Sequence, residues 1–415
     1  MPSGHSGNYT SLTDATPFET SAETIDKPVK PRFAVISLNR SPPAPVATRS
    51  TLAALKEVFP DYEMDVIYVT DQIRRSPLIL VTAAAVASAT YAPGLLRRRK
   101  LLRRAIFRTP YIFRWIRRRL AREITPAAYE FSIQIQSLFD GSVPGLPHFV
   151  YTDHVHLENL KLKGFEASDL YSRAWIDCER EIYRNAATVF TWSSNVSRAL
   201  VEDYGVEAAR VERVNAGSNA TVPETRPVEA ERYARKKILF VGSDWKRKGG
   251  PMLLEAFRAV RTRHPDATLT IVGEGPETID IPGVEHVGRI PLAALPVYYA
   301  DASIFCMPTS REPFGSVFVE AMWQQLPIVA TRVGALPDIV EDGVNGFLVP
   351  PGAADRLAEH LSTLLDDPHL CATMGQAARD RAETGYDWPV VARRIRRRIE
   401  AELAARGRGA PEAGE

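Results

Sequence analysis

Short apolar runs alternate with amphipathic helical patterns along most of this 415-residue chain, and the alternation begins twice. The first series opens with RFAVISL at residues 32–38, and the second opens with KKILFVGS at residues 236–243. Apolar runs of this kind, separated by helices, are typical of parallel strands that are covered on both faces. We therefore predict an α/β fold of two Rossmann-like, doubly wound domains that face a cleft, with a ligand bound at the carboxyl ends of the strands.

The chain is long enough for two hydrophobic cores, and its composition suggests where they end. A polar stretch with Pro223 and Pro227 separates the two series and is expected to be a linker. Both ends of the chain are poor in apolar residues, which favours disorder. The predicted organisation is a disordered extension at 1–30, an N-terminal domain at 31–222, a linker at 223–235, a C-terminal domain at 236–386, a helix at 387–405 that packs back toward the N-terminal domain, and a disordered tail at 406–415.

Charge and cysteine content narrow the class of protein. The formal net charge is +2, so a preference for anionic partners must come from local clusters. Cys178, Cys306 and Cys371 lie far apart and have no metal-ligand spacing, so we predict reduced thiols and no metal site.

Targeting signals are not apparent in the sequence. Residues 1–30 lack the basic start and apolar core of a secretion signal. The apolar stretch at 78–96 contains Pro93 and Gly94, which we expect to shorten its helix to about 14 residues, whereas a membrane span needs roughly 20. We therefore predict a cytoplasmic protein without a transmembrane helix.

The most informative motif is EPFGSVFVEAM at residues 312–322. Glu312 follows a buried strand pattern, and Glu320 lies in the next predicted helix. Gly315 permits close backbone approach, and the N–H groups of Gly315, Ser316 and Val317 open that helix. A helix N-terminus carries roughly half a positive charge and free donors, which suits a phosphate or a polar sugar. Each carboxylate can accept a pair of hydroxyl protons, although a solvated Glu320 is the simpler alternative.

From residue 237 to residue 387 the chain resembles glycosyltransferase family 4, which comprises retaining enzymes of the GT-B fold. The motifs that carry the resemblance are collinear with those of the family. They are Gly242, Lys248-Gly249, VGEGP at 272–276, Gly288-Arg289, residues 308–322, LPIVA at 326–330 and NGFLV at 345–349.

The resemblance implies a site for a nucleotide-sugar donor that needs neither a metal nor another cofactor. Lys248 would lie on the diphosphate and supply the positive charge that Mg²⁺ supplies elsewhere. Glu320 would hold the ribose hydroxyls, and Glu312 would hold the transferred sugar. Lys248 and Glu312 are accordingly catalytic candidates. The other donor-binding residues that these motifs imply are Gly242, Ser243, Arg247, Gly273, Arg289, Ile290, Phe314, Gly315, Ser316 and Val317.

One departure from the family pattern concerns positive charge. The family usually has an arginine five residues before the lysine, and Ser243 occupies that position here. The adjacent Lys246 or Arg247 can restore the charge, and we favour Arg247. Arg289 would border the nucleobase, although a charge on the rim of the site is an equal alternative.

The N-terminal half matches the family less well. Its loop after the first strand, NRSPPAP at 39–45, has no glycine, and Arg49 offers a cation nearby. Asp153 and His154 end a buried strand pattern where the family often has a residue near the reacting carbon. Both are catalytic candidates, and a structural role as a loop cap is the alternative. The segment VERVNAGSN at 211–219 resembles a family loop, so Gly217 and Asn219 are expected to touch the donor across the cleft.

Residues 72–122 contain fourteen Arg or Lys and no Asp or Glu. Apolar residues interleave with these cations at helical spacing. Because a cationic amphipathic helix suits an anionic membrane surface, we predict contact with a membrane through residues 97–122. The alternative is a set of helices of the N-terminal domain whose arginines are solvated or paired with acids elsewhere. No recognition module for nucleic acid accompanies the charge, so nucleic acid is not an expected partner.

These observations predict a metal-independent, retaining hexosyltransferase of cell-envelope polysaccharide synthesis. Its donor would be linked to UDP or GDP, and its acceptor would be a lipid-linked or glycan molecule. We expect it in the cytoplasm or at the inner face of the plasma membrane. Retention is implied by the resemblance. A double displacement would need a carboxylate nucleophile near the anomeric carbon, and no N-terminal residue stands out for that role. The resemblance implies instead a reaction on the front face of the donor, in which the leaving phosphate helps to deprotonate the acceptor. Two alternatives stay open: a nucleotide-sugar epimerase on the same fold, and a catalytically silent GT-B binding module.

Overall fold

The computed structural model describes residues 30–38, 46–162, 164–219, 230–276 and 278–408. Several sequence-based predictions fall outside these ranges. They are the disordered extension up to residue 29, the loop at 39–45, residues 223–229 of the predicted linker, and the tail from residue 409.

The N-terminal half contains a parallel sheet in the order β2-β1-β3-β4-β5-β6. Its strands are β1 (Arg32–Ser37), β2 (Glu63–Tyr68), β3 (Phe131–Ile135), β4 (His148–Thr152), β5 (Thr188–Thr191) and β6 (Val211–Arg213). The central strands β3, β4 and β5 are buried along their whole length, as expected for apolar runs covered on both faces. The strand order reverses between β1 and β3, where a doubly wound sheet opens a binding crevice.

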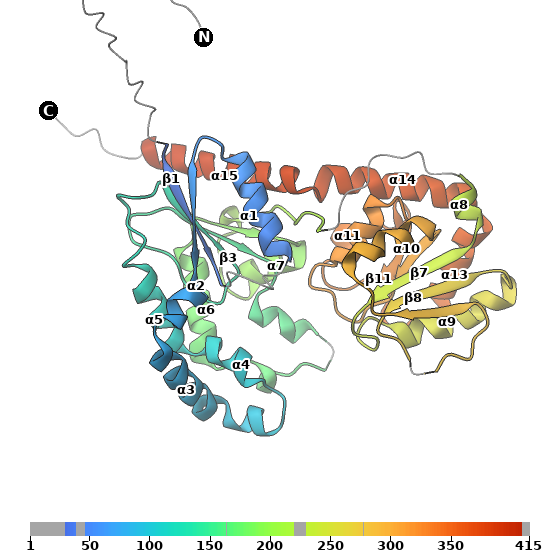
Figure 1. Ribbon diagram of the computed structural model, residues 1–415, viewed down its shortest axis with the longest axis horizontal. Coiled ribbons are helices and arrows are strands. Elements are labelled where there is room, and N and C mark those ends of the chain that lie inside the picture. Colours follow the sequence, from blue (N-terminus) through green and yellow to red (C-terminus); the bar gives the residue numbers. More distant parts are fainter. Residues whose placement is uncertain (1–29, 39–45, 163, 220–229, 277, 409–415) are drawn as a thin grey trace, which may run out of the picture. The chain divides into compact units, whose positions relative to one another are not determined.

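Helices cover both faces of this sheet (Figure 1). They are α1 (Val46–Val58), α2 (Val69–Arg74), α3 (Pro77–Leu96), α4 (Leu102–Ala105), α5 (Pro110–Leu120), α6 (Arg173–Asn185) and α7 (Ser194–Glu202). Short 3-10 turns lie at Ile106–Arg108, His156–Lys161, Ala167–Asp169 and Ala208–Arg210.

Helix α3 differs from the prediction for residues 78–96. It runs for 20 residues, although Tyr91 leaves helical backbone angles and Pro93 lies inside it. The kink therefore divides the helix, as expected for a proline, without ending it. Among the described residues, α3 is long and apolar enough to cross a membrane by length and composition alone, which is weak evidence for a span. Ala83, Ala87 and Tyr91 are buried, whereas most of the helix is exposed.

The C-terminal half contains a second parallel sheet in the order β12-β11-β10-β7-β8-β9. Its strands are β7 (Lys237–Gly242), β8 (Thr268–Gly273), β9 (Val284–Gly288), β10 (Ile304–Met307), β11 (Ile328–Thr331) and β12 (Gly346–Val349). This is the strand order of the dinucleotide-binding Rossmann fold, with the reversal between β7 and β10. The predicted α/β architecture with two Rossmann-like sheets is confirmed.

The helices of this half flank its sheet. They are α8 (Ala230–Ala234), α9 (Gly250–Arg263), α10 (Leu295–Asp301), α11 (Ser316–Trp323), α12 (Leu336–Ile339), α13 (Ala354–Asp366) and α14 (Pro368–Gly385), with a 3-10 turn at Leu292–Ala294. Helix α8 lies in the expected linker. The Arg232 guanidinium fastens α8 to the C-terminal half by donating to the carbonyls of Tyr299, Ala302 and Gln324.

The last helix, α15 (Trp388–Arg408), packs on the N-terminal half beside α1 (Figure 1). Val391, Ile395 and Ile399 are buried in the same hydrophobic cluster as the N-terminal strands. Arg396 adds an ion pair with Asp61 at 2.7 Å. The helix continues three residues beyond 405, so the disordered tail predicted from residue 406 is wrong for residues 406–408.

We expect Ile395→Ala to lower the free energy of unfolding of the N-terminal half by about 2–5 kcal/mol, because it leaves a cavity in a closed core. Guanidinium titration followed by tryptophan fluorescence would measure the loss. The matched control is Arg397→Ala, an exposed position on the same helix, with an expected change within about 0.5 kcal/mol. Equal losses for the two variants would contradict the packing of α15.

Candidate functional site

The candidate site lies where the strand order of the C-terminal sheet reverses. The loop after β7 (residues 243–249) and the loop after β10 (residues 308–315) leave neighbouring strands at their carboxyl ends. Gly249 has φ +81°, and a Cβ there would overlap the carbonyl oxygen of Pro308. A glycine is therefore required for the two loops to approach this closely.

Lys248 and Glu312 meet at the centre of this site. The Lys248 ammonium lies 2.5 Å from a carboxylate oxygen of Glu312, and their side chains are only 12% and 7% exposed. The carbonyl of Glu312 also accepts a hydrogen bond from the Ala335 amide, and a Cβ on Gly334 would overlap that carbonyl oxygen. Two loops thus hold Glu312 in place, so the predicted catalytic pair is brought together in the fold.

Helix α11 begins beside this pair. Gly315, at φ +101°, is its N-cap, and Ser316 and Val317 are the half-buried residues of its first turn. Their position agrees with the predicted use of a helix N-terminus for an anionic or polar ligand. Phe314 is different, because its buried ring packs edge-on against Trp192, 5.1 Å between centroids. It is thus part of the protein core.

Glu320 lies on α11 behind the first turn. The Tyr299 hydroxyl donates a hydrogen bond to its carboxyl at 3.0 Å and also contacts the carbonyl of Val317. Burial raises the pKa of Glu320 to about 7, and the Tyr299 hydrogen bond opposes this shift. The carboxyl can therefore exchange a proton near neutral pH. Tyr299 was not identified from the sequence, because it lies in a different helix without a motif of its own.

Lys246 and Arg247, the two candidates to replace the family arginine that is absent at Ser243, have different surroundings in the structure. Arg247 is paired with Asp244 at 2.9 Å, and its guanidinium also donates to the carbonyl of Arg311 at 3.0 Å. Lys246 is exposed and has no ion pair among the described residues. Arg247 thus braces the loop before Glu312, whereas Lys246 is the uncommitted charge. Ser243 itself is exposed at the end of β7.

The remaining donor-binding candidates of the C-terminal half lie along the ends of β7, β8 and β9. Gly242 and Gly273 are paired in register, and a Cβ on Gly273 would overlap the carbonyl oxygen of Gly242. Arg289 is exposed and forms an ion pair with Glu274, which agrees with a charge on the rim. Ile290 packs against the core cluster of this half.

Gly217 and Asn219 lie in the segment after β6, and their predicted contact with the donor stays a prediction. A Cβ on Gly217 would overlap the indole ring of Trp388, so this glycine permits close packing at the start of α15. Asn219 is half-buried, and its side-chain oxygen is buried without a hydrogen bond among the described residues.

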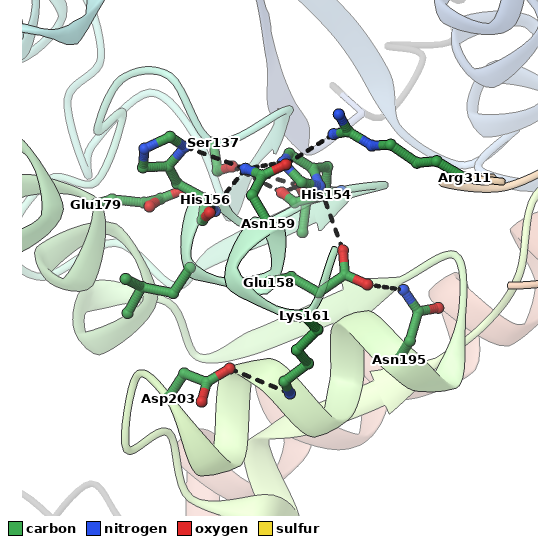
Figure 2. A network of polar contacts seen from close by, with 12 residues as sticks. Ser137, His154, His156, Glu158, Asn159, Lys161, Glu179, Asn195, Asp203 and Arg311 are labelled. Carbon is green, nitrogen blue, oxygen red and sulfur yellow. Dashed lines mark hydrogen bonds and ion pairs between the residues drawn. The ribbon is translucent and has the colours of Figure 1, made fainter. Parts of the chain in front are cut away.

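Asp153 and His154 follow β4 at the carboxyl edge of the N-terminal sheet. Burial raises the pKa of the Asp153 carboxyl, although the adjacent His154 opposes the shift. His154 contacts Glu158 at 3.4 Å and Asn159 at 3.1 Å. Asn159 in turn accepts a hydrogen bond from Arg311 at 2.7 Å, so this network reaches the loop that carries Glu312 (Figure 2).

Arg311 was missed by the sequence analysis, although it lies directly before Glu312 within the quoted motif. It lines a pocket of about 400 Å³ together with Glu312 and His154, which we call the Glu312 pocket. The other lining residues are Glu158, Lys161, Leu162, Ser310, Pro313, Arg332, Val333, Gly334 and Pro351. Arg49 lies on α1, and its predicted role stays untested.

The predicted membrane contact through residues 97–122 is wrong for helix α5. Its apolar side chains Ile112, Phe113, Ile116 and Leu120 are all buried in the core of the N-terminal half. Two of its arginines are paired: Arg117 with Asp140 and Glu181, and Arg119 with Glu123. The alternative of ordinary domain helices with paired arginines therefore holds for α5.

Comparison with known proteins gives three kinds of similarity. Residues 235–367 match the family model described as Glycosyl transferases group 1, and this range contains Lys248, Glu312 and Glu320. The matched range is less than half of the chain. It coincides with the part whose motifs carry the resemblance.

Named relatives cover a larger part of the chain. The GDP-mannose-dependent alpha-(1-6)-phosphatidylinositol monomannoside mannosyltransferase of Mycolicibacterium smegmatis is 32% identical over 54% of this chain and 64% of its own length. A D-inositol 3-phosphate glycosyltransferase of Corynebacterium aurimucosum is 31% identical over 52% of this chain and 58% of its own length. The chain thus spans less than two thirds of these relatives, and the similarities support a place in the glycosyltransferase superfamily.

Solved structures establish the fold over almost the whole chain. A sucrose-phosphate synthase from Thermosynechococcus elongatus superposes with a TM-score of 0.60 at 19% identity, covering 91% of this chain and 100% of that one. HepE of Anabaena in complex with UDP and glucose superposes with a TM-score of 0.56 at 16% identity, covering 88% and 99%. The predicted GT-B fold is confirmed.

The raised pKa of Glu320 predicts a pH-dependent stability. Because the folded protein holds this proton up to about pH 7 and the unfolded chain only to its ordinary pKa of 4.5, folding stability falls as the pH rises through this window. We expect the wild-type free energy of unfolding to fall by about 3 kcal/mol relative to Glu320→Gln between pH 4 and pH 8.

Denaturant titrations of the two proteins at intervals of one pH unit would measure this difference. The control is Glu285→Gln, which changes an exposed glutamate of the same half and should run parallel to the wild type. A constant difference between wild type and Glu320→Gln would show that Glu320 does not titrate in this range.

Proposed function

We propose that this protein is a retaining glycosyltransferase that moves a hexose from a nucleoside diphosphate sugar to an acceptor hydroxyl without a metal ion. The observation that carries the proposal is the partly buried Lys248–Glu312 pair at the carboxyl ends of β7 and β10, beside the N-terminus of α11. The likeness of residues 235–367 to Glycosyl transferases group 1 supports it.

The donor would be held by groups of the C-terminal half. Lys248 would bind the diphosphate, with Lys246 as an additional cation and the first turn of α11 as a source of N–H donors. Glu320 would accept hydrogen bonds from the ribose hydroxyls, and Glu312 from the transferred sugar. We further place the nucleobase near Arg289 and the backbone that follows β9.

Transfer would proceed on the face of the sugar from which the diphosphate leaves. The acceptor oxygen forms a bond to the anomeric carbon while the bond between that carbon and the diphosphate oxygen breaks. The acceptor proton passes to the departing phosphate. Lys248 would stabilise the negative charge that develops on the diphosphate, and Glu312 and His154 would position the sugar in the Glu312 pocket.

The acceptor would be a lipid-linked or glycan molecule, and the protein would act in the cytoplasm at the inner face of the plasma membrane. The relative from Mycolicibacterium smegmatis is a mannosyltransferase named for a phosphatidylinositol monomannoside, which supports a lipid acceptor. Exposed apolar side chains of α3 and the segment after it would contact the membrane: Leu78, Leu80, Val81, Leu96, Leu101 and Leu102. The exposed Arg97 and Arg98 beside them suit anionic lipids.

Thermal unfolding with UDP, GDP or ADP, each in the presence of EDTA, tests the donor site. A nucleotide at a hundred times its dissociation constant adds about 2.7 kcal/mol to the free energy of unfolding. We expect stabilisation by one nucleotide despite the chelator. A protein that no nucleotide stabilises would be the catalytically silent module. Conversion of the sugar without an acceptor would indicate an epimerase.

Lys248→Ala tests whether Lys248 contacts the diphosphate or only supports the fold of the site. We expect this variant to bind the matching nucleoside diphosphate at least tenfold more weakly, because a charge-assisted phosphate contact is lost, and to bind the nucleoside unchanged. Isothermal titration would measure both. The control is Lys237→Ala, at the opposite end of β7, where the lysine pairs with Asp301. Equal losses for diphosphate and nucleoside would remove the phosphate role from Lys248.

The membrane surface predicts a second binding phenotype. Leu78 and Val81 are 80% and 68% exposed, so we expect the double substitution Leu78→Ser and Val81→Ser to weaken vesicle binding roughly tenfold. Flotation with phosphatidylcholine vesicles containing phosphatidylglycerol would measure it, and higher salt should weaken wild-type binding. The control is Leu292→Ser, an exposed leucine of the C-terminal half. Unchanged binding of the double variant would exclude α3 as the contact.

A further inference from the structure

A second pocket, of about 320 Å³, lies next to the carboxyl ends of β3 and β4. Five cationic side chains line it, and we call it the arginine pocket. They are Arg99, Lys100, Arg104, Arg108 and Arg311. The proposed function gives these residues no role.

The two carboxylates in the arginine pocket do not balance this charge. Asp169 is engaged by Arg99 at 3.4 Å. Glu179 is buried, and burial raises its pKa, which favours its neutral form. The Tyr204 hydroxyl and the His156 amide donate hydrogen bonds to Glu179. Burial also lowers the pKa of the His156 ring to about 3, so that ring is uncharged at neutral pH.

Three guanidinium groups of the arginine pocket form no direct ion pair among the described residues, although Glu158 and Glu312 lie near Arg311 and Glu179 lies near Arg108. Arg104 is exposed, and its side chain forms no hydrogen bond or ion pair in the described part of the chain. Arg108 is half-buried, lies 5.0 Å over the ring of Tyr171, and donates to the backbone carbonyl of Arg104. Arg311 contacts the neutral amide of Asn159 at 2.7 Å. Burial of the Arg108 guanidinium without a direct ion pair is unfavourable, and an anionic ligand bound between Arg108 and the exposed Arg104 would compensate it.

The arginine pocket adjoins the Glu312 pocket. Arg311 and His154 line both, and Asn159 contacts each of them (Figure 2). An anion held by Arg104 and Arg108 would therefore place the rest of its molecule toward Glu312, where the transferred sugar is proposed to lie. This position is on the acceptor side of the reaction.

We propose that the arginine pocket binds a phosphate group of the acceptor, so that the acceptor is a phosphorylated alcohol or sugar. The identification of the bound molecule as the acceptor rests on the proposed function. The existence of an anion site rests only on the residues that line the pocket. Guanidinium groups match phosphate because their N–H donors form a planar fork. A phosphate monoester carries up to about two negative charges and suits a cluster of arginines that form no direct ion pairs.

Direct binding tests the anion site independently of catalysis. The probe is glucose 6-phosphate, titrated calorimetrically with the matching nucleoside diphosphate already saturating the donor site, and glucose is the matched uncharged probe. We expect binding of glucose 6-phosphate but not of glucose, and an at least tenfold loss of affinity in Arg104→Gln. The control is Arg103→Gln, an exposed arginine on the same helix α4 that does not line the pocket, with unchanged affinity.

Arg108→Gln provides a second variant, and because Arg108 is half-buried its folding is checked by the nucleotide-induced thermal shift. Loss of phosphate binding with an unchanged nucleotide shift supports the proposal. Three results would overturn it: equal affinities for glucose 6-phosphate in wild type, Arg104→Gln and Arg108→Gln; displacement of glucose 6-phosphate by the nucleotide; or no binding at all. In each case the nucleotide shift still reports on the proposed function, so the two failures are distinguishable.

Two further assays distinguish a soluble phosphorylated acceptor from a lipid headgroup. In the first, sugar transfer is assayed with glucose 6-phosphate and glycerol 3-phosphate against glucose and glycerol. In the second, it is assayed with vesicles of phosphatidylcholine containing either phosphatidic acid or diacylglycerol. Preference for the soluble phosphates assigns a free acceptor, and preference for phosphatidic acid assigns a lipid headgroup. The proposal is contradicted if sugar is transferred equally well to glucose, glycerol and diacylglycerol, the compounds without phosphate, and if Arg104→Gln does not change these rates.

Discussion

The ion pair between Lys248 and Glu312 is the contact on which the candidate site depends. Two partly buried charges are tolerated only where their geometry is held well, since each would otherwise lose hydration without compensation. The fold supplies that geometry through backbone contacts. Gly249 lets the loops after β7 and β10 approach each other, and Arg247 braces the carbonyl before Glu312. The site is thus assembled by two neighbouring strands of one Rossmann-like sheet.

The positive charge of the N-terminal half serves two different purposes. On α5, arginines pair with acids such as Asp140 and Glu123, so they belong to the packing of that half. Nearer the ends of β3 and β4, Arg104 and Arg108 face a pocket and form no direct ion pair among the described residues. Paired charges stabilise the fold, and charges without a direct ion pair leave attraction for a ligand.

Particular elements show how far sequence reasoning reaches. Strand patterns such as RFAVISL appear as β1 because a run of buried apolar residues has few other solutions in a soluble fold. The apolar face of α5 was predicted to contact a membrane, but it is buried in the protein. Helical periodicity shows that one face is apolar, and it does not show what covers that face. Helix α8 lies in a stretch predicted to be a linker, because its five residues are too few to show a helical period.

Local periodicity and residue chemistry were sufficient to predict the two-sheet α/β fold, the motif from Glu312 to Glu320, and Lys248 at the start of a helix. The contacts of Lys248 with Glu312 across 64 positions, of Tyr299 with Glu320, and of Arg311 with Asn159 become visible only in the folded chain. Such contacts join segments that are distant in the chain. They depend on strand order and loop approach, which no local pattern encodes.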